Sequence, residues 1–202
     1  MDVDLRDLTV TEAYKLLTGS VAPRPIAWVS TMDREGNRNL APFSFFTVAS
    51  RNPPMLLLSI GPGVGERKGT VKDTLANIRQ LEQFVINVVP YSLGNQMQKS
   101  SENYSKEIDE IELAGLTVVP SKKVQPPRVK ESPISFELEL DRILELGSDH
   151  LVIGNVVHYH IEDDYYLGNY KVNQEKVSPL ARLAGNYSEI RDLFTLPRGG
   201  EN

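Results

Sequence analysis

Short apolar runs and apolar–polar alternation recur along this chain, and both patterns are typical of β-strands. Residues 136–141 alternate Phe and Leu with Glu and Asp, which indicates a strand with one face exposed to water. Residues 54–60 are almost continuously apolar, and the run is too short for a free-standing helix. A central strand buried on both sides is therefore predicted there. Further strands are predicted at 25–31, 39–50, 83–89 and 151–161.

The strand with the alternating pattern and the strand predicted at 151–161 are expected to be long antiparallel neighbours. The alternating segment and the β-branched segment 151–161 are expected to pair across a turn at Gly147 to Asp149. The second segment contains a glycine, Gly154, that suits a β-bulge.

Helical spacing is limited to short stretches. Residues 11–18 predict a short helix, and a second helix is predicted from Thr70, whose side chain and that of Asp73 are spaced as a capping box. A polar helix is predicted at 92–103, and residues 104–132 are irregular. The chain is therefore predicted to be mainly β, a closed β-barrel with peripheral helices, and not an alternating βαβ sheet.

Composition excludes several classes of protein. The formal net charge of -5 disfavours nucleic acid or an anionic membrane as the main partner. The chain has no cysteine, which excludes disulfides, thiol nucleophiles and iron–sulfur clusters. Neither a signal-peptide pattern nor a bilayer-spanning apolar run is found, so a cytoplasmic protein without nucleic-acid or membrane partners is expected. The length of 202 residues suits one large domain, residues 1–202.

A glycine-rich loop lies between a predicted strand and the helix from Thr70. Its sequence, GPGVGERKGT, matches neither the dinucleotide-binding fingerprint nor the P-loop, so both sites are disfavoured. Arg67 and Lys68 nevertheless precede the free amides of a helix start, where charge-assisted hydrogen bonds can hold a phosphate. A solvated loop with an ordinary capping box remains the alternative.

Four polar side chains lie at strand ends on the two sides of one turn: Ser30, Thr31, Asn39 and Ser44. They could converge on a polar ring system, although serine and threonine are also ordinary turn residues. The single tryptophan, Trp28, is predicted to be a core residue, with stacking on a cofactor as the alternative.

The histidines His158 and His160 are two residues apart on a predicted strand and therefore share a face. This spacing is compatible with metal binding or proton transfer, but the sequence shows no third ligand nearby, so surface or packing roles are favoured. The chain lacks the GxSxG motif of a serine hydrolase. The carboxylates Glu137, Glu139 and Asp141 are predicted to form the exposed face of their strand.

Taken together, several segments resemble the flavin reductase-like family, which binds FMN in a split β-barrel. Each segment is short, but their order and spacing match, and the resemblance covers nearly the whole chain. The segments are RPIAWVST (24–31), NLAPFSFF (39–46), PPMLLLSI (53–60), KDTLANI (72–78), FVINVV (84–89) and SPLARLAGNYSE (178–189).

The resemblance implies a set of FMN-binding residues. The isoalloxazine ring would lie along Ser30–Thr31 and Ala41–Ser44, and the phosphate near Ser59 and the basic loop. Family members are commonly homodimers, so Arg182, Gly185 and Tyr187 would complete a site in the partner chain. The expected cofactor-binding residues are Ser30, Thr31, Asn39, Ala41, Pro42, Phe43, Ser44, Ser59, Arg67, Lys68, Lys72, Asp73, Thr74, Arg182 and Tyr187.

The activity implied by the resemblance is reduction of FMN by NADH or NADPH. No catalytic residue is expected, because the flavin accepts hydride itself and the protein supplies orientation and electrostatics. One alternative is a non-catalytic FMN-binding or electron-transfer protein built on the same barrel. Another is a flavin enzyme that acts on an organic substrate, with a pocket shaped by residues 104–132.

Overall fold

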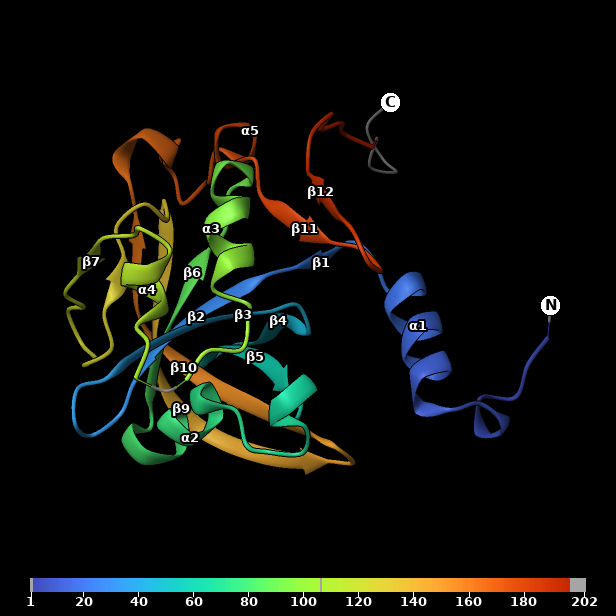
Figure 1. Ribbon diagram of the computed structural model, residues 1–202. Coiled ribbons are helices and arrows are strands. Elements are labelled where there is room, and N and C mark those ends of the chain that lie inside the picture. The colour runs from blue at the N-terminus through green and yellow to red at the C-terminus, as the bar shows by residue number, and fades with distance from the viewer. Residues whose placement is uncertain (1, 106, 197–202) are drawn as a thin grey trace.

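The computed structural model describes residues 2–105 and 107–196, and its centre is a seven-stranded antiparallel sheet (Figure 1). The strands follow the spatial order β3-β2-β6-β9-β10-β5-β4. Their bounds are Ala27–Met32 (β2), Arg38–Phe43 (β3), Phe46–Arg51 (β4), Pro54–Ile60 (β5), Gln83–Val88 (β6), Ile134–Leu146 (β9) and Asp149–Ile161 (β10).

The sheet curls so that the end of one edge strand lies close to the start of the other. β3 and β4 lie at opposite ends of the strand order, yet only Ser44 and Phe45 separate them in the chain. The amide of Ser59 donates to the carbonyl of Phe45 at 2.8 Å, which ties this corner to β5. The inner face encloses an apolar core that includes Leu58, Phe84 and Leu138. The prediction of a barrel with peripheral helices is confirmed, and the fold is a split barrel.

The sequence pattern misplaced β5. Its burial alternates, with Leu56, Leu58 and Ile60 buried and the residues between them partly exposed. β5 pairs with β10 and β4, next to the edge of the sheet and not at its centre. The prediction of a strand buried on both sides is therefore wrong, because an apolar run does not reveal that its second face is left uncovered.

The long pair β9 and β10 agrees with the sequence prediction. The strands run antiparallel over their whole length, and the register shifts between Ile153 and Gly154. A Cβ at Gly154 would lie 2.6 Å from Cζ of Phe84, so this shift occurs where only glycine leaves room for the core ring. A second shift, between Val156 and His158, changes which residues of β10 face Glu137.

A second core lies between the outer face of β2–β3 and the short helices that cover it. Trp28 is fully buried there, as predicted, and its indole Nε1 donates to the hydroxyl of Ser100 at 2.8 Å. Met97 and Ile111 pack into the same cluster from the helices. The elements on this side are η3 (Tyr91–Leu93), α3 (Gly94–Lys99), α4 (Glu110–Leu113), β7 (Val118–Val119), β8 (Arg128–Val129) and α5 (Gln174–Val177).

The helix α2 (Asp73–Leu81) packs against β2 and β3 and follows the turn η2 (Gly65–Arg67). Its N-cap is Lys72, which makes no side-chain capping bond. The predicted capping box of Thr70 and Asp73 is wrong, because the Thr70 hydroxyl donates to the carbonyl of Arg67 and Asp73 pairs with the Arg67 guanidinium. The first amides of α2 are therefore left for another acceptor.

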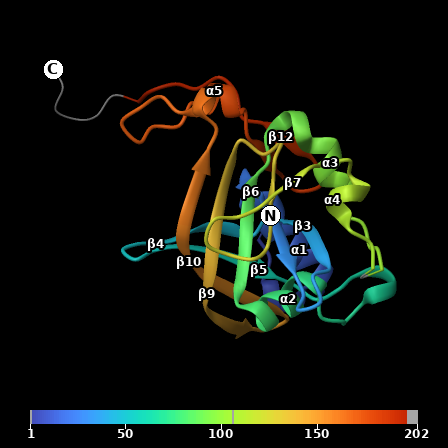
Figure 2. The same ribbon diagram turned by 90° about the vertical axis from the view of Figure 1, so that its left-hand side faces the viewer.

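The first helix, α1 (Val10–Ser20), projects away from the barrel (Figure 1), and it lies behind the sheet in the view of Figure 2. A capping box of Thr9 and Glu12 begins it, but Thr18 is its one buried residue. It joins the barrel through a small sheet of β1 (Arg24–Pro25), β11 (Leu180–Arg182) and β12 (Tyr187–Glu189). No helix in the described parts of the chain is long and apolar enough to cross a membrane. The remaining elements are η1 (Leu5–Asp7) and η4 (Asp163–Tyr165).

Candidate functional site

Three adjoining hollows form a groove where β3 ends. Pro42 lines all three, Lys72 lines two of them, and Phe43 and Ser44 line the other pair. We name them the basic hollow (about 80 Å³, beside Arg67 and Lys72), the apolar hollow (about 470 Å³, beside Phe43 and Phe45) and the tail hollow (about 250 Å³, beside Arg182 and Tyr187). Segments far apart in the sequence thus converge on one surface.

The basic hollow is built from the glycine-rich loop and the start of α2. The loop folds tightly on itself, because the Gly63 amide donates to the carbonyl of Thr70 and the Gly69 amide donates back to Gly63. A Cβ at Gly63 would lie 2.3 Å from the carbonyl oxygen of Arg67, so no other residue suits this position. The Arg67 guanidinium donates to both oxygens of Asp73, at 2.6 and 2.9 Å, which fixes it at the mouth of the hollow.

Lys72 stands between the basic and the apolar hollow. Its ammonium lies 5.3 Å from the centre of the Phe43 ring, a cation–π distance. Burial lowers the pKa of Lys72, and the nearby Arg67 lowers it further, while Asp149 opposes both. An anion in the groove would relieve this unfavourable burial, so the lysine is placed to bind one.

A buried carboxyl group, Glu110, lines the basic hollow. Its Oε2 accepts a hydrogen bond from the Leu40 amide at 3.0 Å, and the residue is 9% exposed. Burial raises the pKa of Glu110 to about 7, and the negative charges of Asp109 and Asp73 act in the same direction. The group therefore changes between a hydrogen-bond donor and an anion near neutral pH.

The apolar hollow lies between the β3–β4 corner and α1. Tyr14 of α1 and Phe45 of the corner face each other, with their ring centres 6.4 Å apart. On the opposite wall the Ser59 hydroxyl donates to Asp149 at 3.3 Å. The hollow therefore has aromatic walls and a polar edge, which suits a flat heterocycle with polar atoms on its rim.

The tail hollow lies beside the small sheet near the C-terminus. The Arg182 guanidinium stacks over the Tyr187 ring at 4.4 Å, and the Tyr187 hydroxyl donates to Gln98 at 2.8 Å. This stacking holds both side chains against the end of α3. Gly185, expected beside them, is not among the residues that line the hollow.

Most residues predicted from the sequence reach this groove, but three do not. Ser30 and Thr31 are fully buried, so neither can touch a ligand in the groove. The Ser30 hydroxyl donates to the Pro127 carbonyl, and the Thr31 hydroxyl accepts from the amides of Asn39 and Asn77. These bonds hold strands and helix together, so the two side chains support the groove from behind. Lys68 is exposed and lies outside the three hollows.

Sequence reasoning missed several residues that line the groove. Tyr14 belongs to a helix that gives no local sign of facing a site, and residues 101–104 follow α3 without a motif. Glu110 falls in the irregular segment that was expected to shape a substrate pocket, and only the tertiary fold brings it there. Asp149 also lines the groove, and the sequence placed it only in the turn before the predicted strand 151–161.

The split barrel is the fold implied by the resemblance to the flavin reductase-like family. The chain belongs to this family: the flavin reductase like domain matches residues 19–187. An uncharacterized protein of Aquifex aeolicus is 40% identical over 174 residues, which are 86% of this chain and 87% of that protein.

Two solved structures extend the comparison. Nitrilotriacetate monooxygenase component B from Bacillus cereus has a TM-score of 0.91 and 33% identity, and the match covers 97% of this chain and 98% of that chain. The Pseudomonas fluorescens 2-nitrobenzoate 2-nitroreductase NbaA has a TM-score of 0.87 and 30% identity, with 100% and 99% covered. Family membership supports an oxidoreductase that uses a flavin.

Proposed function

We propose that the protein binds FMN in the groove and catalyses its reduction by NADH or NADPH. The observation that carries the proposal is the continuity of the basic and the apolar hollow through Lys72. FMN has a phosphate at one end and a flat ring at the other, so each end meets a hollow of matching chemistry. The uncapped amides of α2 add donors for the phosphate.

Separate sets of groove residues would bind the phosphate end and the ring end of FMN. Arg67, Lys72 and the α2 N-terminus would hold the phosphate. Gly63 lets the loop backbone pack tightly against the Arg67 carbonyl beside this hollow. Phe43, Phe45 and the backbone of β3 would contact the isoalloxazine ring. The chemistry that FMN supplies when bound is acceptance of a hydride, so the protein has to bind, orient and exclude water.

A homodimer follows from the same proposal. Helix α1 projects from the barrel (Figure 1), and its Val10, Tyr14 and Leu17 have exposed fractions of 87%, 56% and 54%. Such an apolar helix face is stable in water when a second chain covers it. Because Tyr14 and Tyr187 line the groove, a partner chain packed there would border the flavin. Val10→Glu with Leu17→Glu should convert the dimer to a monomer in sedimentation velocity, and a dimer unchanged by both would exclude this face.

The binding proposal is tested with alanine variants and two ligands. FMN and riboflavin differ in the phosphate alone, so Arg67→Ala and Lys72→Ala should weaken FMN by roughly 10- to 100-fold, since charged hydrogen bonds contribute about 1.5–3 kcal/mol, and riboflavin far less. Lys68→Ala is the matched control, because its exposed side chain lies outside the hollows. Equal losses for both ligands, or a loss for the control as large as for the variants, would place the phosphate elsewhere.

The activity is tested separately from binding. Steady-state oxidation of NADH or NADPH with free FMN as acceptor supports the reductase. A tightly bound flavin that neither nucleotide reduces would instead support the electron-transfer alternative. Nitroaromatic acids should also be assayed as electron acceptors. The similar NbaA is a 2-nitrobenzoate 2-nitroreductase, and Tyr104 and Glu110 line the groove.

A further inference from the structure

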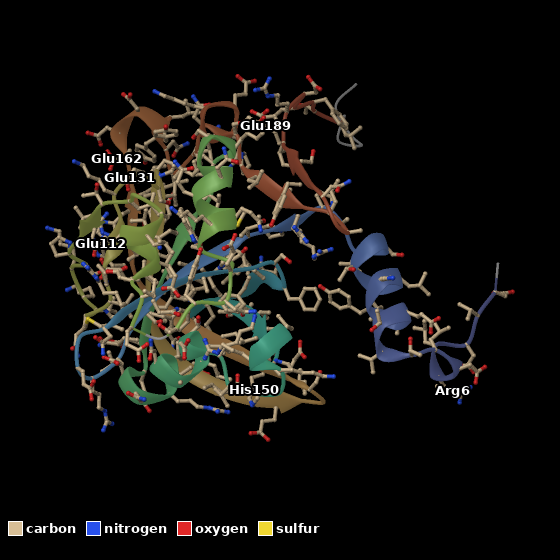
Figure 3. All side chains as sticks on the ribbon, in the orientation of Figure 1. Arg6, Glu112, Glu131, His150, Glu162 and Glu189 are labelled. Atoms are coloured by element: carbon tan, nitrogen blue, oxygen red, sulfur yellow. The ribbon has the colours of Figure 1, made fainter. Side chains whose placement is uncertain are left out.

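A cluster of two histidines and one glutamate lies on the outer part of the barrel, at the opposite end of β10 from the flavin groove. The groove is lined by Asp149 at the first residue of β10, whereas the cluster contains His158 and His160 near its last residue. In Figure 3 the label of His150 marks the first end of β10 and that of Glu162 the other. The proposed flavin chemistry makes no use of this cluster.

The β-bulge in β10 creates the cluster. Val156 pairs with Leu138, but the register then shifts so that His158, and not Val157, lies opposite Glu137. Without the shift, Val157 would face Glu137 and both histidines would point to the other side of the sheet. The two imidazole rings instead lie 4.5 Å apart on the Glu137 side.

Glu137 is held rigidly and is fully buried, contrary to the exposed face predicted from the alternation of β9. The loop after β7 covers it, and its carboxylate accepts the amides of Lys122 at 2.7 Å, Lys123 at 2.6 Å and Val124 at 3.3 Å. His160 donates from Nε2 to Oε1 of the same carboxylate at 2.5 Å. Donors that fix a carboxylate in this way are the supporting shell found around metal ligands.

We propose that Glu137, His158 and His160 bind a divalent transition-metal ion of the zinc type. One ligand atom from each residue lies within 4.8 Å of the other two, so small rotations of the imidazoles bring all three around one ion. Zinc takes nitrogen and oxygen ligands at about 2.0–2.2 Å, and imidazole with carboxylate suits it. The ion would replace the proton between Nε2 of His160 and Glu137, and that imidazole would carry its proton on Nδ1.

The site would fasten the loop 121–125 to the sheet. The same carboxylate already binds three amides of that loop, so an ion on Glu137 would tie the loop to both histidines of β10. Arg128 of β8 is the cation that acts on His160, and its charge opposes a bound ion. Arg128→Gln should therefore tighten the metal.

The experiment is a titration of chelator-treated protein with Zn²⁺ in competition with a chromophoric chelator. We expect one Zn²⁺ per chain, at least 100-fold weaker binding in His158→Ala and in His160→Ala, and several-fold tighter binding in Arg128→Gln. The control is His150→Ala, because His150 is the remaining histidine of the chain and lies at the other end of β10.

Co²⁺ provides a second readout, because coordination by imidazole and carboxylate gives it a visible spectrum that His158→Ala should abolish. His158 takes no part in the bonds that hold Glu137, so this variant keeps the loop anchored even if His160→Ala unfolds. Absence of stoichiometric Zn²⁺ binding, or equal binding by wild type and His158→Ala, overturns the proposal. A loss in His150→Ala as large as in His158→Ala also overturns it. None of these outcomes depends on flavin binding.

Discussion

Replacing Glu110 with glutamine should stabilise the protein at alkaline pH and leave its stability at acidic pH nearly unchanged. Glu110 is 9% exposed, and burial raises its pKa from 4.5 to about 7. Glutamine has almost the same shape, and its carbonyl oxygen can still accept the bond from the Leu40 amide. The variant therefore removes the ionisation and retains the packing.

The size and direction of the effect follow from the two pKa values. Below pH 4.5 Glu110 is protonated in the folded and the unfolded chain, so it adds no pH dependence. Between pH 4.5 and about 7 the unfolded chain releases the proton while the folded chain retains it, and stability falls as pH rises. This rise in pKa lowers the free energy of unfolding by about 3 kcal/mol, at about 1.36 kcal/mol per pKa unit. Above pH 7 Glu110 is ionised in both states, and its effect on stability no longer changes with pH.

The assay is urea unfolding of both proteins at one protein concentration, between pH 5 and pH 8. Other groups titrate in this range, but they are common to both proteins and cancel in the difference. We expect the Glu110→Gln variant to gain about 3 kcal/mol relative to wild type at pH 8 and less than about 1 kcal/mol at pH 5. A difference that does not change with pH would contradict the raised pKa of Glu110 as its cause, because it would assign the effect to packing and not to ionisation.

Three further predictions follow from the described contacts. Gly154→Ala should destabilise the barrel by about 1–3 kcal/mol in urea unfolding, because its Cβ meets Phe84, whereas Gly185→Ala, with open space around it, should change stability by less than about 0.5 kcal/mol. Ser100→Ala should cost about 1–3 kcal/mol because the buried indole N–H of Trp28 loses its acceptor, and the exposed Ser101→Ala is the control; equal effects would contradict this. FMN affinity should fall between pH 6 and pH 8 more steeply than riboflavin affinity, and Glu110→Gln should flatten the FMN curve; parallel FMN curves for both proteins would exclude Glu110 as the cause.

The strands could be predicted from the sequence because their periodicity is local. The alternation at 136–141 and the β-branched segment 151–161 both became strands, and Gly154 marks a register shift as expected. What covers a face could not be predicted in the same way. Glu137 was expected in water, yet the loop after β7 covers it, and the alternation within β9 cannot reveal contact with a segment outside that strand.

The groove was predicted in part for a similar reason. Residues of the β3 end and the α2 start were expected near a cofactor, and the structure brings Ala41 to Ser44, Arg67 and Lys72 together. Ser30 and Thr31 share the same motifs, but hydroxyls that bond inside the barrel look identical in sequence to hydroxyls that face a ligand. Glu110 has a raised pKa because tertiary packing buries it.

A competition among flavins tests most directly whether the basic hollow binds the phosphate of FMN. The protein is unfolded to remove any bound flavin, refolded with equal amounts of FMN, FAD and riboflavin, separated from free ligand, and its retained flavin is identified by mass. We expect wild type to retain FMN at one per chain, and we expect the variant with both Arg67→Ala and Lys72→Ala to lose this preference. A refolded wild type that retains no flavin, or retains riboflavin as well as FMN, would contradict the assignment of the basic hollow to the phosphate.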